Sequence, residues 1–406
     1  MHDGWQLEAA RSVAREAVQE LEDLGVDEGL AELLGQLARI EMLVQEDFGR
    51  AIAVADRALA MAERLDRPAL VADLLVTRGT ALSSSGRRLE GLGAIEAGCR
   101  LAQSEGLLGV EGRALLNVSG PLSERDPQAM LVASRRALEL GRQIGDRQGV
   151  SMAANNLAES ARFTGDWDEA IAELRREAEA SSGDELHWIR LALVAMLANR
   201  GEETHEVVAP LLEYVRVQAA TGEPAWQQQE DAILGSLDLA AGRYGDAARR
   251  LRNAAETDPF NAALGFAEVA YAALLDRDAA TAAAAVDGMR STGSHGAIVK
   301  LAMRQTAAGM AALEGRVDEA VAGFEVVLDT FRAMDLPFPL ATTGLMMAAL
   351  LDGSIPQVAA ATDEARAIFE QLRARAWLDR LEEAAAEGAR AAAAVDAAAE
   401  RVASAR

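Results

Sequence analysis

The hydrophobic positions of the chain recur at steps of three and four residues, which is the spacing of one face of an α-helix. The clearest example is the stretch 242–259, GRYGDAARRLRNAAETDP. It opens with a glycine, continues with small and large apolar residues at helical spacing, and closes with a proline, which stops a helix. The small alanines allow a second helix to approach closely, and the large residues fill the space between the two. The stretch therefore predicts the second helix of a tight helical hairpin.

The same pattern recurs along most of the chain. Its central position falls, one copy after another, at residues 51, 91, 130, 170, 206, 247, 282 and 320. Neighbouring copies lie 35 to 41 residues apart, which leaves room for two helices of roughly 15 residues and two turns. A helical stretch precedes each copy and carries a small residue where the two helices must cross closely, as at Gly79, Ala158, Gly235 and Ala308. The sequence therefore predicts an all-α array of helical pairs.

The turns inside the pairs contain glycine, for example Gly165 and Gly242. A glycine at this place ends the first helix because it adopts the left-handed conformation without strain. Asp166 follows Gly165 and is placed to cap the second helix of its pair, with Glu169 at the capping-box position.

The order glycine, aromatic, alanine, large apolar, alanine and proline in 242–259 resembles the second half of a tetratricopeptide (TPR) repeat. The resemblance extends over roughly residues 30–375. It implies a right-handed α-solenoid, the TPR superhelix, of about eight to nine helix pairs. We expect one continuous solenoid over residues 1–380, with an N-terminal capping helix at 1–29. An Ala-rich helical or frayed tail is expected at 381–406.

The composition limits what such an array can bind. The chain has 406 residues and a net charge of −24, and Lys300 is its only lysine. Phosphate binding needs a basic surface, so direct nucleic-acid binding is not expected. The single cysteine, Cys99, excludes an intramolecular disulfide and a cysteine-based zinc site. Neither a signal peptide nor an apolar run of about 18 residues is found, so we expect a cytoplasmic protein with no membrane segment.

The sequence contains no pattern typical of catalysis. A phosphate-binding P-loop ends in Gly-Lys-Ser/Thr. The only lysine, Lys300, is preceded by valine and followed by leucine, so this motif is excluded. The four histidines are far apart, and the adjacent carboxylates lie on helices rich in Glu and Arg, where such pairs are usually solvated. We therefore expect no enzymatic activity, no catalytic residues, no metal site and no cofactor.

In the TPR architecture, the first helix of each pair lines a concave groove. Positions two, five and nine of that helix, counted back from Gly165, are Met152, Asn155 and Glu159. Amides there could bond to a peptide backbone, and Arg and Glu side chains could select charge. The same polar residues could instead solvate the helix or bond to the adjacent repeat. The partner-binding candidates of the groove are Asn155, Asn156, Glu159, Arg162, Asp73, Thr77, Gln229 and Arg304.

The longer period, the many arginines and the stretch EARAIFEQLRARAWLDRLE (364–382) narrow the resemblance. They are similar to the C-terminal TPR arrays of bacterial LuxR/MalT-type ATPase regulators and of cyclase–ATPase signalling proteins. This resemblance implies a regulatory or sensor module that binds a protein or peptide partner. A small-molecule effector sensor that controls an ATPase or transcription factor is the alternative. The carboxylate clamp of some TPR proteins needs lysines that this chain lacks. The oligomeric state is left open.

Overall fold

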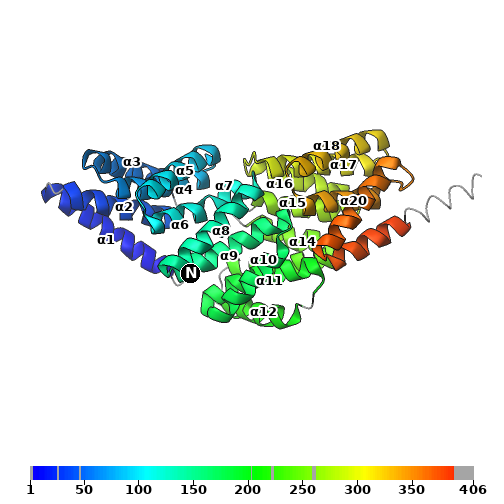
Figure 1. Ribbon diagram of the computed structural model, residues 1–406, viewed down its shortest axis with the longest axis horizontal. Helices are drawn as coiled ribbons and strands as arrows, with labels where there is room; N and C mark the ends of the chain where they lie inside the picture. The colour runs from blue at the N-terminus through cyan, green and yellow to red at the C-terminus, as the bar shows by residue number, and fades with distance from the viewer. Residues whose placement is uncertain are drawn as a thin grey trace, which may run out of the picture. The chain divides into compact units, whose positions relative to one another are not determined.

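A computed structural model describes residues 3–24, 27–44, 47–202, 204–220, 224–257 and 262–387 of the chain. Within these ranges every regular element is a helix, and successive helices pack against their neighbours in the chain (Figure 1). The predicted all-α helical solenoid is therefore confirmed. Pro259 and residues 388–406 of the expected tail lie outside the described residues.

The chain divides into two compact units. Unit 1 consists of Met1–Ser123 and Ala129–Leu157, and unit 2 of Glu124–Gln128 and Ala158–Arg406. The single continuous solenoid expected over residues 1–380 stays a prediction.

Unit 1 begins with α1 (Asp3–Leu24), which falls within the stretch 1–29 where the sequence predicts a capping helix; its capping role stays a prediction. The helices that lie wholly in this unit are α1, α2 (Asp27–Val44), α3 (Phe48–Arg64), α4 (Pro68–Ser84), α5 (Arg88–Ser104), α6 (Leu108–Asn117) and α7 (Ser119–Ser123). Helices α8 (Pro127–Ile144) and α9 (Arg147–Thr164) have residues in both units.

Unit 2 continues the array to the end of the described chain. Its helices are α10 (Trp167–Ala180), α11 (Gly183–Arg200), α12 (His205–Ala219), α13 (Pro224–Ala240), α14 (Tyr244–Ala255), α15 (Ala262–Leu275), α16 (Ala279–Ser291), α17 (Ala297–Leu313), α18 (Val317–Ala333), α19 (Pro337–Leu350) and α20 (Pro356–Leu372). A further helix, residues 375–387, follows α20. We refer to residues 373–387 as the C-terminal segment.

Small residues hold the pairs together where the sequence predicted close crossings. In unit 1, a Cβ atom on Gly79 of α4 would lie 2.7 Å from the carbonyl oxygen of Gly91 in α5. In unit 2, a Cβ atom on Gly235 would lie 2.9 Å from Leu251 Cγ. Real Cβ atoms do not approach other heavy atoms so closely, so the backbones meet at these points because no side chain separates them.

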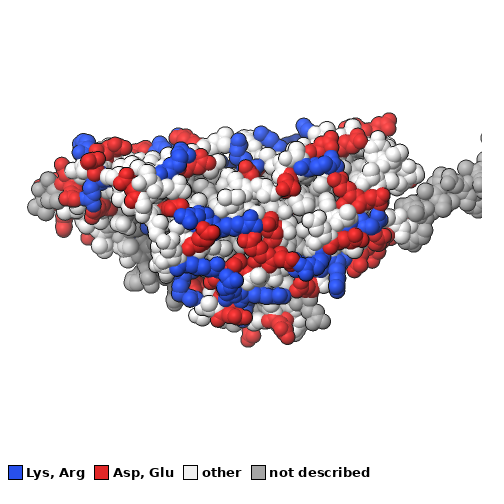
Figure 2. All heavy atoms as spheres, in the orientation of Figure 1, with Lys and Arg blue, Asp and Glu red and all other residues white. Residues whose placement is uncertain are grey.

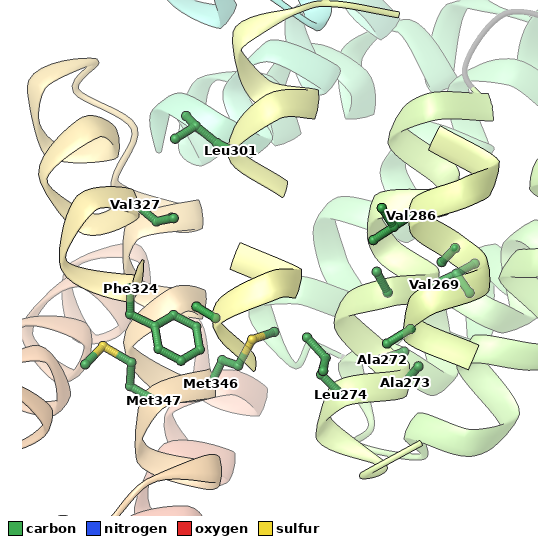
Figure 3. Packing of buried hydrophobic residues seen from close by; sticks show 14 of the residues in the cluster. Val269, Ala272, Ala273, Leu274, Val286, Leu301, Phe324, Val327, Met346 and Met347 are labelled. Carbon is green, nitrogen blue, oxygen red and sulfur yellow. The ribbon is translucent and has the colours of Figure 1, made fainter. Parts of the chain in front are cut away.

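The main core of unit 2 is continuous through its last four helical pairs. Apolar residues from α14 to α20 form one buried cluster, which includes Val269, Leu274, Phe324 and Met346 (Figure 3). Each pair therefore buries its apolar stripe against both neighbours, as a solenoid requires.

The array of unit 2 also returns on itself. The rings of Trp167 in α10 and Phe338 in α19 meet edge to face, with centroids 5.1 Å apart. The Tyr271 hydroxyl of α15 donates to the Thr342 carbonyl of α19 at 3.2 Å. Helix α19 thus contacts helices of earlier pairs, α10 and α15, as well as its neighbours in the chain.

The capping prediction at Asp166 is wrong. Asp166 precedes α10, but its side chain forms no capping hydrogen bond to that helix. It accepts from the Thr164 hydroxyl at 2.8 Å instead. Side-chain caps of described helices include Asp47, which accepts from the Arg50 amide, Asp146, which accepts from the Gly149 amide, and Asp278, which accepts from the Thr281 amide.

Candidate functional site

Helix α9 carries four of the predicted groove residues along one stripe. Met152, Asn155, Glu159 and Arg162 follow each other at steps of three and four, so they share a face of the helix. The stripe changes character along its length, because Met152 is 48% exposed whereas Arg162 is partly buried.

The two asparagines of α9 make different contacts. The Asn155 amide nitrogen donates to the Ser151 carbonyl of its own helix at 3.1 Å. The Asn156 amide nitrogen reaches the Leu116 carbonyl of α6 at 3.4 Å. Asn156 therefore joins two repeats of unit 1, whereas Asn155 bonds within α9.

Arg162 forms an ion pair within unit 2. Its guanidinium contacts the carboxylate of Glu268 in α15, and the two side chains are 28% and 26% exposed. Burial lowers the pKa of Arg162, but the Glu268 carboxylate raises it by more, helped by Glu159, so the net direction is upward. The guanidinium also lies 5.3 Å from the centre of the Phe163 ring. Arg162 therefore links helices of non-adjacent pairs.

Asp73 and Thr77 of α4 are held by an arginine that the sequence analysis did not single out. One Nη atom of Arg113 in α6 lies 2.8 Å from Asp73 Oδ1 and 3.2 Å from Thr77 Oγ1. Burial lowers the pKa of Arg113, and the Asp73 carboxylate opposes that shift. The spacing of the repeats could have identified this arginine, because Arg113 lies 40 residues after Asp73, which is one repeat period.

The remaining candidates lie in unit 2. Gln229 Oε1 is 2.7 Å from Nε2 of the buried His187, 42 residues earlier, whose ring stacks on Tyr214. Arg304 is exposed on α17, and its neighbour Gln305 donates to the Thr343 hydroxyl, 38 residues later, at 3.1 Å.

Most of these polar contacts join residues separated by 38 to 42 positions. They connect the first helix of one pair to the first helix of the next, which was the alternative left open by the sequence. Three residues differ from this pattern. Asn155 bonds within its own helix, and Met152 and Arg304 are exposed. Their side chains are the ones that a partner could reach without breaking a contact between repeats.

The rest of the described surface offers little chemistry. Acidic and basic side chains are interspersed over the face seen in Figure 2. Within the described ranges, His, Cys, Asp and Glu side chains do not gather in groups of three or more that could hold a metal ion. The helices described here include none that is both long and apolar enough to cross a membrane.

A cleft of about 220 Å³ lies on α14, at the turn between α15 and α16. Arginines and carboxylates both line it, among them Arg249, Arg252, Asp276 and Asp278. The Thr281 hydroxyl and amide bind Asp278 and lower the pKa of its carboxyl group. The cleft therefore presents fixed charges of both signs.

Comparison with known proteins leaves the family open. The scan against protein-family models and the search of curated proteins gave no match. One solved structure that matches is described as a circular tandem repeat protein with novel repeat topology and enhanced subunit contact surfaces. It is 15% identical, covers 98% of this chain and 92% of its own, and has a TM-score of 0.18. Because this score is low, the solenoid assignment depends on the helices and packing described above.

Proposed function

We propose that the chain is a non-catalytic, TPR-like scaffold that binds a protein or peptide partner on the first helices of its repeats. The observation that carries this proposal is the free half of the α9 stripe, where exposed Met152 lies one turn from Asn155. A methionine supplies an adaptable apolar contact, and an amide can pair with a peptide backbone. The resemblance to bacterial LuxR/MalT-type regulators supports a cytoplasmic regulatory or sensor role.

Site-specific photo-crosslinking tests this proposal. A photoreactive phenylalanine analogue replaces Met152 in the full chain, and crosslinked proteins are collected from cells. The matched control places the same analogue at Val326 on α18, the second helix of its pair, where the side chain is 42% exposed. We expect one discrete crosslinked partner from position 152 and none from position 326.

Adding Asn155→Ala to the Met152 probe should reduce that crosslink severalfold while leaving thermal unfolding unchanged. Equal crosslinking from positions 152 and 326 would show that the α9 stripe is not a binding face. Asn156→Ala is a poor choice for this test because it breaks a contact between repeats.

The cleft at α14 favours a small-molecule effector as the second candidate function. Its opposed arginines and carboxylates suit a small ligand that carries both charges. A thermal-shift screen against zwitterionic metabolites tests this candidate, and Arg252→Ala should abolish any shift that arises from the cleft.

A further inference from the structure

The last residue of α20 and the C-terminal segment together lie against the turns of three consecutive repeats in unit 2. The contacts are regular, because residues spaced by four meet successive turn glycines: Leu372 of α20 meets Gly165, whereas Ala376 and Arg380 of the segment meet Gly201 and Gly242. These glycines all have positive φ angles. We refer to the surface of these three turns as the turn seat.

The turns of the seat approach the returning chain closely. A Cβ atom on Gly201 would lie 3.0 Å from the backbone nitrogen of Ala376, and one on Gly242 would lie 2.1 Å from Arg380 Nε. Gly86 and Gly315 occupy equivalent turns with similar φ angles, but a Cβ atom there would meet nothing within 4 Å. The close contact therefore belongs to the seat and is not a general property of the repeat turn.

Polar groups anchor the C-terminal segment to the seat. Arg380 donates to the Ala240 carbonyl at 3.3 Å, at the C-terminal end of α13, where a cation is favoured. The Trp377 indole N–H donates to Asn199 Oδ1 at 3.1 Å. Arg373 pairs with Asp168, whose pKa is lowered first by its hydrogen bond with Arg200 and further by Arg373.

The segment is built as a separable helix. It is joined to α20 through Arg373, an exposed residue with φ of 55°. Its buried side chains are Ala374, Trp377 and Leu381, which share one face, and residues 382–387 are exposed or partly exposed. The apolar anchoring of the segment is concentrated in Trp377, whose ring centroid lies 5.2 Å from that of Phe338 and 6.3 Å from that of Phe369. A terminal helix that follows an exposed turn can open locally before the rest of a fold, provided that a competing helix offers a similar aromatic anchor.

We propose that the turn seat is a docking site for an α-helix of a partner protein, occupied by the chain's own C-terminal segment until that helix replaces it. The partner helix would carry a small residue at the Gly201 turn and an arginine four residues later at the Gly242 turn. A large aromatic residue beside the small one would take the place of Trp377. This is recognition of a helix by periodic anchors. The seat includes none of the residues of the α9 stripe, so this proposal does not depend on the proposed function.

The test uses the full chain and a fluorescein-labelled peptide with the sequence of residues 372–387. Arg380→Glu places a negative charge at the end of α13 and should release the C-terminal segment without altering the seat. Faster hydrogen exchange of residues 374–387 verifies the release. Because apparent affinity scales with the fraction of vacant seats, we expect the peptide to bind this variant at least about tenfold more tightly than wild type by anisotropy.

Two second-site changes identify where the peptide binds. Adding Gly242→Ala to Arg380→Glu should abolish binding, because the new methyl group takes the place of the arginine. Adding Gly315→Ala should leave binding intact, since it introduces the same backbone strain into a turn that contacts nothing. A peptide that carries Arg380→Glu should not bind any of these proteins.

A disulfide lock covers the case in which Arg380→Glu unfolds the chain. A Cβ atom on Gly201 would lie 3.4 Å from Ala376 Cβ, close to the separation in a disulfide. The lock is Gly201→Cys with Ala376→Cys in a Cys99→Ala background. The oxidised protein should bind no peptide, and reduction should allow binding.

Equal binding by the oxidised and reduced proteins would overturn the proposal. So would a released segment with no gain in peptide affinity. A dimer of the Arg380→Glu chain that the peptide cannot dissociate, seen by light scattering, would also overturn it, because a second copy would then be the occupant.

Discussion

The crossing of α4 and α5 gives a prediction in which two glycine-to-alanine changes have opposite signs. A Cβ atom on Gly79 would lie 2.6 Å from Ile95 Cγ1, 2.7 Å from the Gly91 carbonyl oxygen and 2.8 Å from the Ile95 backbone nitrogen. Two of these atoms belong to the backbone, so α5 must move to accommodate a methyl group. Gly93 lies on α5 too, but it is exposed and a Cβ atom there would meet nothing within 4 Å.

The magnitudes follow from these contacts. Overpacking a well-packed crossing costs about 1–3 kcal/mol, and three contacts under 3.0 Å place Gly79→Ala at the upper end. Alanine in a helix gains about 0.5–1 kcal/mol over glycine, which leaves a net loss of about 2 kcal/mol. Gly93→Ala keeps only the gain, so it should stabilise the protein by about 0.5–1 kcal/mol.

Urea unfolding of both variants measures the difference. Circular dichroism follows all helices, whereas four of the five tryptophans, at positions 167, 188, 226 and 377, belong to unit 2. The predicted shifts should therefore appear in the dichroism and be much weaker in tryptophan fluorescence, to which unit 1 contributes one residue of five. If Gly79→Ala proved as stable as Gly93→Ala, close approach could not be the reason for a glycine at position 79.

Three further predictions concern polar groups. In a double-mutant cycle, Arg162→Ala and Glu268→Ala should show a coupling of about 1–2 kcal/mol, between the values of exposed and buried ion pairs, and additive effects would contradict the pairing. Asn156→Ala should destabilise the chain by about 1 kcal/mol and Asn155→Ala by less than about 0.5, as measured by urea unfolding. Burial raises the pKa of Tyr244 from 10.0 to about 12, although the positive charge of Arg380 acts to lower it. The folded state keeps this proton longer, so about 3 kcal/mol of stability present below pH 10 should be lost by pH 12. Tyr244→Phe should remove that part of the alkaline loss, and an unchanged pH profile would refute the assignment.

The sequence was sufficient for the features that local chemistry determines. Helical periodicity and the small crossing residues Gly79 and Gly235 follow from which side chains share a helix face, and the structure confirms both. Capping was predicted less well. Asp166 has the expected sequence context but bonds to the preceding turn, whereas Asp47 and Asp278 cap their helices without having been singled out. A capping bond depends on side-chain geometry that a residue type alone does not specify.

The candidate site was predictable only in part. Repeat spacing indicates which first helices are neighbours, so the contact of Asp73 with Arg113 could have been found by looking one period ahead. The contact of Arg162 with Glu268 spans 106 positions. It depends on the rotation added by each intervening pair. Small rotations accumulate over several repeats, and their total cannot be deduced from any single residue of the sequence.

The same reasoning explains why the turn seat is invisible in the sequence. Gly242 and Gly315 occupy the same position in their repeats and have φ angles of 72° and 76°. A Cβ atom on the first would meet Arg380, about 140 residues along the chain, and a Cβ atom on the second would meet nothing within 4 Å. Since the left-handed turn conformation by itself favours glycine at both places, glycine at the seat does not distinguish it from the other turns. The difference lies in the segment that returns, where Trp377 is the one aromatic residue of positions 373–406 and Arg380 follows it at helical spacing. Such residues, rather than the repeat glycines, are what a search for similar seats in other solenoids should use.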